Sequence, residues 1–249
     1  MAVWAISDLH LAFGGPPRDD RFSALRREQA ARVELEWRAT VAGNDLVLLP
    51  GDISMARNHR DVQPDLAWLD RLPGLKVLAP GNHDGWWNEV GRVRKLMRRS
   101  QVAVDGDAIA LGDAVVCGAR SCSAETEESA AENQSQPALD RLAKSLSQAC
   151  LLRSQIATER ASRGDPQRGQ ITIYVLWHHP PFNRFGAAGG AVALLADAGV
   201  TACVYGHLHA EDQWSRAVQG LVNGVRYHCV AADAVGFRPL RIDRPAAAT

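Results

Sequence analysis

Five apolar segments of this chain each end in a cluster of polar side chains, and this repetition constrains the fold more than any other feature. The endings read Asp-Leu-His from position 8, Gly-Asp from 51, Gly-Asn-His-Asp from 81, His-His-Pro-Pro from 178 and Gly-His-Leu-His from 206. Short apolar runs are typical of buried strands, and open α/β sheets place their chemistry at the carboxyl ends of strands. Because unrelated turns would not collect carboxylates, imidazoles and an amide repeatedly, we expect the five clusters to converge on one site.

The apolar pattern predicts strands that alternate with helices. Strands are expected over residues 2–7, 45–50, 76–79, 171–177 and 201–205, a hairpin over 108–118, and closing strands over 225–230 and 240–242. Helices are expected over residues 21–41, 64–72, 137–161 and 190–199. The segment 121–135 is rich in Ser, Glu, Ala and Gln without periodicity, which predicts a mobile excursion. The length of 249 residues and the alternation favour one α/β domain spanning residues 1–249.

The composition is that of an ordinary globular protein without a targeting signal. Lysines and arginines number 28, as do aspartates and glutamates, so no global charge attracts nucleic acid or an anionic membrane. The five cysteines are widely spaced, which predicts reduced thiols, with a Cys117–Cys122 pair as the open alternative. No apolar run approaches the ~20 residues of a membrane span, and the N-terminus does not resemble a signal peptide. We therefore expect a cytoplasmic protein with no membrane partner.

One local basic segment keeps nucleic acid open as a partner. It contains Arg92, Arg94, Lys95, Arg98 and Arg99. These side chains either line a groove for a phosphate backbone or form the solvated face of an amphipathic helix. The spacing of the intervening apolar residues favours the helix.

The polar clusters form a donor set for metal ions. Aspartate, asparagine and histidine suit Mn²⁺, Fe, Zn²⁺ or Ni²⁺ and disfavour Ca²⁺ or an iron–sulfur cluster, and the lack of thiolates argues against a structural zinc site. The candidate ligands are Asp8, His10, Asp52, Asn82, His207, His209 and one of the adjacent pair His178 and His179. So many ligands exceed the needs of one ion. Two divalent transition metal ions that share a carboxylate, about 3.5 to 4 Å apart, are the usual apparatus for displacement at phosphorus.

In this order, the motifs from Asp8 to His209 resemble those of the calcineurin-like metallophosphoesterase superfamily, over about four-fifths of the chain. The contexts G-N-H-D-G-W-W and C-V-Y-G-H-L-H are similar to those of a bacterial subgroup of predicted phosphohydrolases. The resemblance implies a four-layer α/β/β/α sandwich of two mixed sheets flanked by helices. The alternation of strands and helices agrees with that architecture.

The resemblance also divides the ligands between two metals. It implies that one ion is held by Asp8, His10, Asp52 and His209. It implies that Asp52 bridges to a second ion, completed by Asn82, His178 and His207. Of the adjacent histidines, His178 is the expected ligand, because the ligand of the family is followed by one residue and then the prolines. His179 would then pack behind the ligands or support them.

The expected chemistry follows from charge. Two divalent cations lower the pKa of a bridging water, so that the resulting hydroxide attacks phosphorus in line while the cations clamp the phosphoryl oxygens. The departing alkoxide needs a proton, and His83 is the expected donor. Asp84 is expected to orient the His83 imidazole and to raise its pKa.

Four further residues are candidates for contact with the substrate. Arg120 follows the predicted hairpin and Arg184 follows the Pro-Pro turn, so each either reaches a substrate phosphate or is a surface arginine. Trp86 and Trp87 either stack on a base or pack in the core.

We therefore expect a metal-dependent phosphoesterase whose substrate is a phosphate ester. A phosphodiester such as a cyclic or linear nucleotide is favoured, with a phosphomonoester as the alternative. A nuclease acting on DNA or RNA ends is a rival that the neutral net charge disfavours. A non-catalytic binding scaffold of the same fold is a second rival, disfavoured because every motif position is filled.

Overall fold

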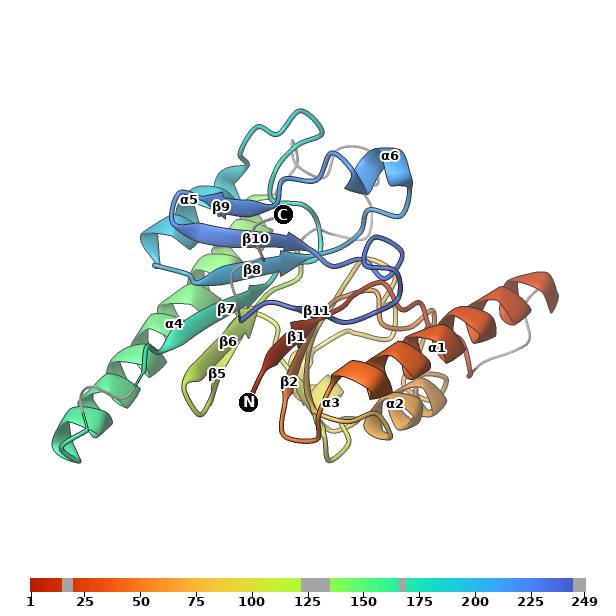
Figure 1. The fold of residues 1–249 in the computed structure, drawn as a ribbon, viewed down its shortest axis with the longest axis horizontal. Helices are drawn as coiled ribbons and strands as arrows, with labels where there is room; N and C mark the ends of the chain where they lie inside the picture. The colour runs from red at the N-terminus through yellow and green to blue at the C-terminus, as the bar shows by residue number, and fades with distance from the viewer. Residues whose placement is uncertain (15–19, 122–134, 166–168, 244–249) are drawn as a thin grey trace.

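The computed structural model describes residues 1–14, 20–121, 135–165 and 169–243, and its strands form two sheets (Figure 1). The first sheet contains β1 (Val3–Ala5), β2 (Leu46–Pro50), β3 (Leu75–Ala79), β4 (Gln101–Ala103) and β11 (Leu240–Arg241). The second sheet contains β5 (Asp107–Leu111), β6 (Ala114–Gly118), β7 (Thr172–Leu176), β8 (Ala202–Tyr205), β9 (Gly220–Val222) and β10 (Val225–Cys229).

Both sheets are mixed. The first has the order β11-β1-β2-β3-β4, in which β1 to β4 run parallel and β11 is antiparallel to β1. The second has the order β5-β6-β7-β8-β10-β9, in which the two edge strands are antiparallel to a parallel centre. The carboxyl ends of the parallel strands therefore lie along one edge of each sheet, where polar residues from different strands can meet.

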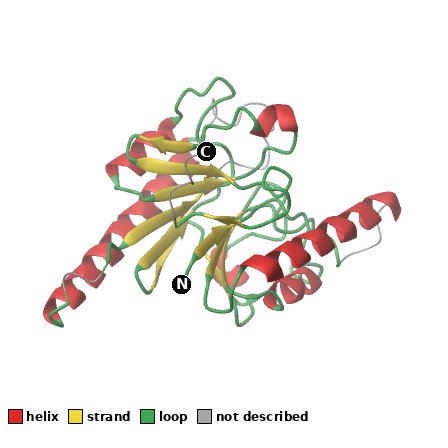
Figure 2. Ribbon diagram, viewed as in Figure 1, coloured by secondary structure: helices red, strands yellow, loops and turns green. Residues whose placement is uncertain are grey.

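Helices cover the outer face of each sheet, as Figure 2 shows. On the first sheet pack α1 (Asp20–Thr40), α2 (Gln63–Asp70) and α3 (Val90–Arg94). On the second pack α4 (Gln136–Ser162) and α5 (Gly190–Asp197), while the short α6 (Glu211–Trp214) follows β8. The predicted four-layer α/β/β/α sandwich is confirmed.

Alternating apolar side chains explain why the strands are buried on both faces. In β2, Leu46 and Leu48 face the layer between the two sheets, whereas Val47 and Leu49 face the helices. In β7, Leu176 faces the layer between the sheets and Val175 faces α4 and α5. Burial of each of these side chains contributes about 1.5–3 kcal/mol. Their continuous hydrophobicity is what the sequence pattern of a doubly covered strand predicts.

The basic segment differs from the predicted amphipathic helix. The helix α3 ends at Arg94, whose guanidinium donates to the Ala103 carbonyl at 2.9 Å and forms an ion pair with Asp107. Arg92 forms an ion pair with Glu89 at 3.4 Å. Arg94 is thereby held against the protein, whereas the Arg92–Glu89 pair is exposed and neutralises one positive charge of the segment, and both weaken the interpretation of the segment as a groove for nucleic acid.

The predicted elements are otherwise recovered within a few residues, and three short ones were not predicted. These are β4, β9 and α6, which contain three or four residues each and are too short to show a periodicity. Apart from its two end residues, the predicted excursion 121–135 lies outside the described residues.

The described cysteines Cys117, Cys150, Cys203 and Cys229 are free thiols, as expected, and Cys122 lies outside the described residues. Burial raises the pKa of Cys117 to about 12, so this thiol stays protonated and unreactive. Within the described part of the chain, no helix combines the length and the hydrophobicity that crossing a membrane requires.

Candidate metal centre

The five polar clusters meet where β1, β2, β3, β7 and β8 end, and the strand ends are tied together by their backbones. Asp8 N donates to Gly51 O at 3.1 Å, and His10 N donates to Asp52 O at 3.0 Å, which joins the turns after β1 and β2. Gly206 N donates to His178 O at 2.9 Å, which joins the turns after β7 and β8. The convergence predicted from the sequence is therefore present in the fold.

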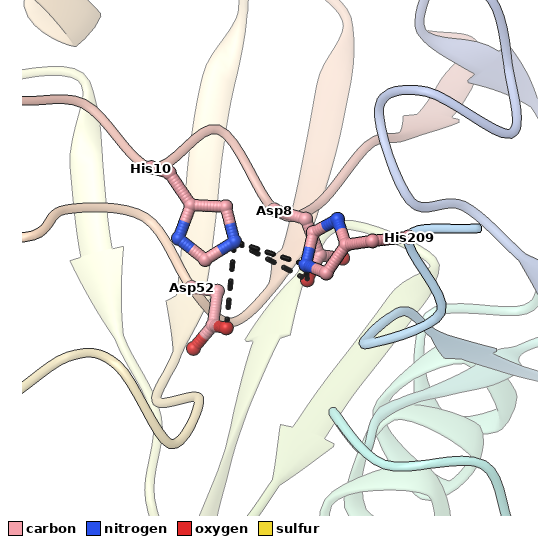
Figure 3. Close-up of side chains that lie close together, drawn as sticks. All are labelled: Asp8, His10, Asp52 and His209. Carbon is pink, nitrogen blue, oxygen red and sulfur yellow. Dashed lines mark hydrogen bonds and ion pairs between the residues drawn. The ribbon is translucent and has the colours of Figure 1, made fainter. Parts of the chain in front are cut away.

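The first donor group consists of Asp8, His10, Asp52 and His209, whose side chains point toward one another (Figure 3). His10 Nε2 lies 3.0 Å from His209 Nε2 and 3.7 Å from Asp52 Oδ2. His209 Nε2 lies 3.4 Å from Asp8 Oδ1. One donor atom from each side chain thus lies within 4.8 Å of all the others, a spacing that fits one metal ion.

The second donor group consists of Asp52, Asn82, His178 and His207. Asp52, His178 and His207 again offer atoms within 4.8 Å of one another. Asn82 Oδ1 lies 3.0 Å from His178 Nε2 and 3.1 Å from His207 Nδ1. The amide therefore stands beside both imidazoles of this group.

Asp52 belongs to both groups, and its environment tests whether cations fit. Its Oδ2 atom is buried and has no hydrogen-bond partner in the described chain. Three imidazole nitrogens, those of His10, His178 and His83, lie 3.4 to 4.0 Å from this oxygen, too far for good hydrogen bonds. A buried carboxylate oxygen without a donor is costly unless a cation compensates it. The residues present therefore fit two metal ions that share this carboxylate.

The backbone at these positions is unusual. Asp8, His10, Asp52 and His207 have φ values of 59°, 43°, 51° and 70°, in the left-handed region that non-glycine residues rarely adopt. Each such residue costs on the order of 1–2 kcal/mol. Such strain is typical of functional sites, where the surrounding structure holds the residue in place.

Two glycines let the ligand turns approach closely. A Cβ at Gly81 would lie 2.1 Å from Asp52 Oδ1, and a Cβ at Gly206 would lie 2.0 Å from Asp8 Oδ2. Both distances are far below van der Waals contact, so any side chain would displace the carboxylates. These glycines therefore define the separation between the turns.

The histidines of the cluster differ in how strongly they hold a proton. Burial opposes ionisation of Asp52, but His178 outweighs it and keeps the pKa of Asp52 below its ordinary value. Burial likewise disfavours charged His178, but Asp52 outweighs it and raises the pKa of His178 to about 9. Burial lowers the pKa values of His10 and His207 to about 4, so both are neutral at pH 7, the form in which imidazole binds metals.

His83 lies at the mouth of the cluster. Its backbone N donates to Asp52 Oδ1 at 2.8 Å, and its Nε2 lies 4.0 Å from Asp52 Oδ2. The imidazole is 41% exposed, so it faces both the donor groups and the solvent. Its ring also makes an edge contact with His10, at a centroid distance of 5.2 Å.

The prediction that Asp84 orients His83 is wrong. Asp84 is fully buried, and its carboxylate accepts hydrogen bonds from Ile53 N, Ser54 N and Trp86 Nε1 at 3.0 Å and from Gly81 N at 2.9 Å. Burial, with a contribution from Asp52, raises its pKa to about 6. The carboxylate thus ties the turn after β2 to the turn after β3, and it is directed at backbone donors and not at the His83 ring.

The two tryptophans pack in the core. Trp86 and Trp87 are 1% and 3% exposed, and their ring centroids are 5.2 Å apart. They belong to the apolar layer beneath α1 and α2, so stacking on a substrate base is excluded for both.

The remaining predicted residues, His179, Arg120 and Arg184, differ in burial and in their partners. His179 is buried, its Nδ1 lies 2.7 Å from Ser121 Oγ, and its ring centroid is 4.2 Å from that of His207. Arg120 donates to the Trp87 carbonyl at 2.8 Å. Arg184 stacks on the exposed ring of Phe185 at 4.8 Å. None of these arginine contacts is to a residue of either donor group.

Sequence reasoning missed Asp233, which follows β10. Its Oδ2 lies 3.6 Å from His209 Nδ1, and this interaction, together with that of Asp8, raises the pKa of His209 to about 10. Asp233 stands in the run Ala-Ala-Asp-Ala, with no neighbouring imidazole or glycine to mark it. No local signal distinguishes it from a turn residue.

The α/β/β/α sandwich and its cluster of Asp, Asn and His donors define the class of the chain, that of metal-dependent phosphoric ester hydrolases. A family model described as calcineurin-like phosphoesterase matches residues 1–211. The chain belongs to this family, as the motifs predicted.

Three individual proteins to which the chain is similar share limited sequence identity with it or match only part of it. Gene 66 protein of Mycobacterium phage L5 is 31% identical over 83 residues, which cover 33% of this chain and only 40% of that protein. A structure of phosphopantetheinyl hydrolase from Mycobacterium tuberculosis is 16% identical, with a TM-score of 0.51, and the match covers 100% of this chain and 98% of that one. A 5'-nucleotidase precursor from Thermus thermophilus is also 16% identical, with a TM-score of 0.39, over 84% of this chain and 42% of that one. At these identities the structural likeness concerns the fold alone.

Proposed function

We propose that the chain, as one domain spanning residues 1–249, hydrolyses a phosphate ester with two divalent transition metal ions. The observation that carries this proposal is the buried Oδ2 atom of Asp52, which lies between the two donor groups without a hydrogen-bond donor. A carboxylate oxygen in this position suits a bridge between two cations.

The proposed ligands of the first ion are Asp8, His10, Asp52 and His209. The proposed ligands of the second are Asp52, Asn82, His178 and His207. When bound, two such ions supply an activated water nucleophile and neutralise charge on the phosphoryl oxygens. The protein holds the donor atoms in place before the ions bind, through the strained turns and the close glycine contacts.

His83 is the proposed proton donor to the leaving group. Its backbone is fixed by the hydrogen bond to Asp52 Oδ1, and its imidazole is exposed beside both donor groups. An alkoxide that leaves phosphorus at this mouth would meet the imidazole first. Because Asp84 is engaged with backbone donors, His83 acts here without a carboxylate partner from its own turn.

The proposed substrate is a phosphodiester, such as a cyclic or linear nucleotide. Arg120 and Arg184 remain proposed contacts to the substrate. Arg120 directly precedes Ser121, whose hydroxyl lies 2.7 Å from His179 Nδ1, and the His179 ring centroid lies 4.2 Å from that of the proposed ligand His207. Mn²⁺ is the first metal to test, and the cytoplasm is the proposed compartment.

The experiment is a panel of phosphodiesters, phosphomonoesters, single-stranded DNA and RNA, assayed with Mn²⁺, Zn²⁺, Fe²⁺ and Ni²⁺ in turn. The panel includes a phosphopantetheinyl ester, because a structural neighbour is named for that activity. We expect metal-dependent turnover of at least one ester, with chelation abolishing it. Absence of turnover by protein that binds two metals would contradict the proposal and favour a scaffold.

The role of His83 has its own test. His83→Ala should retain both metals and lose about 10²-fold or more in kcat on an alkyl phosphodiester, while a nitrophenyl ester, whose leaving group needs no proton, loses much less. His59→Ala is the matched control, because His59 is a partly exposed histidine outside both donor groups. Unchanged turnover of the alkyl diester by His83→Ala would refute proton donation.

A further inference from the structure

The segment after β10 reaches the metal centre from beyond the part of the chain that the family model matches. That match ends at residue 211, whereas Asp233 lies in the turn that follows β10. Ala232 N donates to Ser7 O at 3.0 Å, and Ser7 pairs with Ala231 in a parallel bridge. The turn is thereby fixed next to Ser7, which directly precedes the proposed ligand Asp8.

Asp233 faces the outer nitrogen of His209. Asp233 Oδ2 lies 3.6 Å from His209 Nδ1, while the other ring nitrogen, Nε2, faces Asp8 Oδ1 at 3.4 Å and His10 Nε2 at 3.0 Å. The second carboxylate oxygen of Asp233, Oδ1, accepts a hydrogen bond from Ala234 N at 3.0 Å. The carboxylate is thus held by its own turn and presents one oxygen to the imidazole.

His209 needs such a partner more than the proposed ligands His10 and His178 do. Its side chain is 45% exposed, whereas the side chain of His10 is 4% exposed and that of His178 is fully buried. Packing therefore does not fix the ring of His209. A carboxylate near one nitrogen of an imidazole favours a proton on that nitrogen by charge attraction, which here acts over 3.6 Å without a hydrogen bond and leaves the lone pair of the other nitrogen for a metal.

Arg26 of α1 completes this arrangement. Arg26, Asp233, Asp8 and His209 line one small cavity of about 40 Å³ beside the centre. The guanidinium of Arg26 is near enough to Asp233 for their charges to attract. This cation offsets part of the negative charge that Asp233 adds beside Asp8, so the carboxylate is favoured as a partner of His209.

We propose that Asp233 is a positioning residue, which holds His209 with its proton on Nδ1 and directs Nε2 to the metal of the first donor group. The proposal rests on the proposed function only in requiring that this group binds a metal. It assigns a role in the centre to the C-terminal segment, outside the matched family region.

The test is the affinity of the metal-free protein for Zn²⁺ alone, measured by titration calorimetry without any substrate. Asp233→Ala should weaken one of two Zn²⁺ sites by about 10- to 100-fold and leave the other unchanged. Asp233→Asn, which keeps an acceptor but not the charge, should weaken the same site less. Asp243→Ala is the matched control, because Asp243 is a similarly exposed aspartate of the C-terminal segment, paired with Arg241.

Thermal unfolding of the metal-free variants separates positioning from folding, and we expect equal Tm values for Asp233→Ala and the wild type. Nitrogen NMR of the Zn²⁺-loaded wild type should show the His209 proton on Nδ1. Wild-type Zn²⁺ affinity in Asp233→Ala, a proton on Nε2, or a wild type that binds no Zn²⁺ would each overturn the proposal. Protein that binds Zn²⁺ as expected but cleaves no ester would instead contradict the proposed function alone.

Discussion

The two donor groups of the centre are built differently. In the second group, His178 is fully buried, and its Nδ1 donates to the Pro50 carbonyl at 2.9 Å, so a strand end orients the ring. In the first group, His209 is half-exposed and its Nδ1 faces the carboxylate of Asp233 at 3.6 Å. The comparison teaches that the same task, orienting an imidazole, is performed for His178 by a buried backbone carbonyl and for His209 by a partly exposed carboxylate. We therefore expect the ring of His178 to be held more firmly than that of His209 before any metal binds.

The largest loss of activity is expected from substitution of Asp52, the residue that both donor groups share. Asp52→Asn removes the shared charge, and asparagine tolerates the left-handed backbone of this position better than alanine does. We expect kcat/KM to fall by at least about 10³-fold, more than the loss of a single stabilising donor, with both metals bound more weakly. Kinetics and metal analysis of the purified protein measure this. Asp140→Asn, on the exposed face of α4, serves as the control. Retention of one metal at full affinity would show that the carboxylate is not shared.

A paired substitution tests the difference in rigidity directly. His178→Ala and His209→Ala should each lower activity by more than about 100-fold, because each removes a proposed ligand, whereas loss of an outer partner of a ligand costs about 10- to 100-fold. Only His178→Ala should also destabilise the metal-free chain, by about 1–3 kcal/mol, because it leaves the buried Pro50 carbonyl without its donor. His209→Ala should destabilise the metal-free chain less, because its side chain is half-exposed and its neighbours Asp8 and Asp233 keep backbone donors. Urea unfolding in the presence of chelator measures the stability of both variants. Equal losses of stability would contradict the proposed difference between the two donor groups.

A smaller effect, on the pH dependence of stability, is expected from Asp65, which supports the first donor group. This buried carboxylate accepts hydrogen bonds from Phe13 N at 2.8 Å and from Ser54 Oγ, so it joins the segments that follow His10 and Asp52. Burial raises its pKa from 3.8 to about 6. Between these values the folded chain keeps a proton that the unfolded chain has lost, so stability falls as the pH rises from about 4 to about 6.

Asp65→Asn resembles the protonated carboxyl and should remove this dependence. Relative to the wild type, the variant should gain about 2 kcal/mol in free energy of unfolding between pH 4 and pH 7. Urea titrations at four pH values, without metal, provide the measurement, and Asp140→Asn is again the control. A difference between variant and wild type that does not change with pH would mean that Asp65 is ionised throughout.

The sequence predicted most of the fold and the donor set because both depend on local pattern. Continuous apolar runs such as Leu46–Pro50 predict buried strands, and the polar residues that follow these runs predict the location of the site. The roles of Asp84 and Asp233 were not predictable in this way. Asp84 stands next to His83 in the chain but turns to the backbone of the neighbouring turn, and Asp233 meets His209 only because β10 lies beside β8. For Asp84, adjacency to His83 in the sequence led to a wrong prediction. For Asp233, no adjacency in the sequence pointed to His209.

The left-handed backbone at four of the proposed ligands limits which residues can replace them. Asp, Asn and His are the side chains that both bind metals and tolerate this conformation best, so at Asp8, His10, Asp52 and His207 the same small set of residues satisfies the chemistry and the backbone. Glutamate or cysteine would supply a good ligand atom at an added backbone cost. The shape of the turns thus restricts the residue types at this centre as much as the metals do. To bind a softer metal ion through cysteine thiolates, an engineered variant would first need turns with a different backbone conformation.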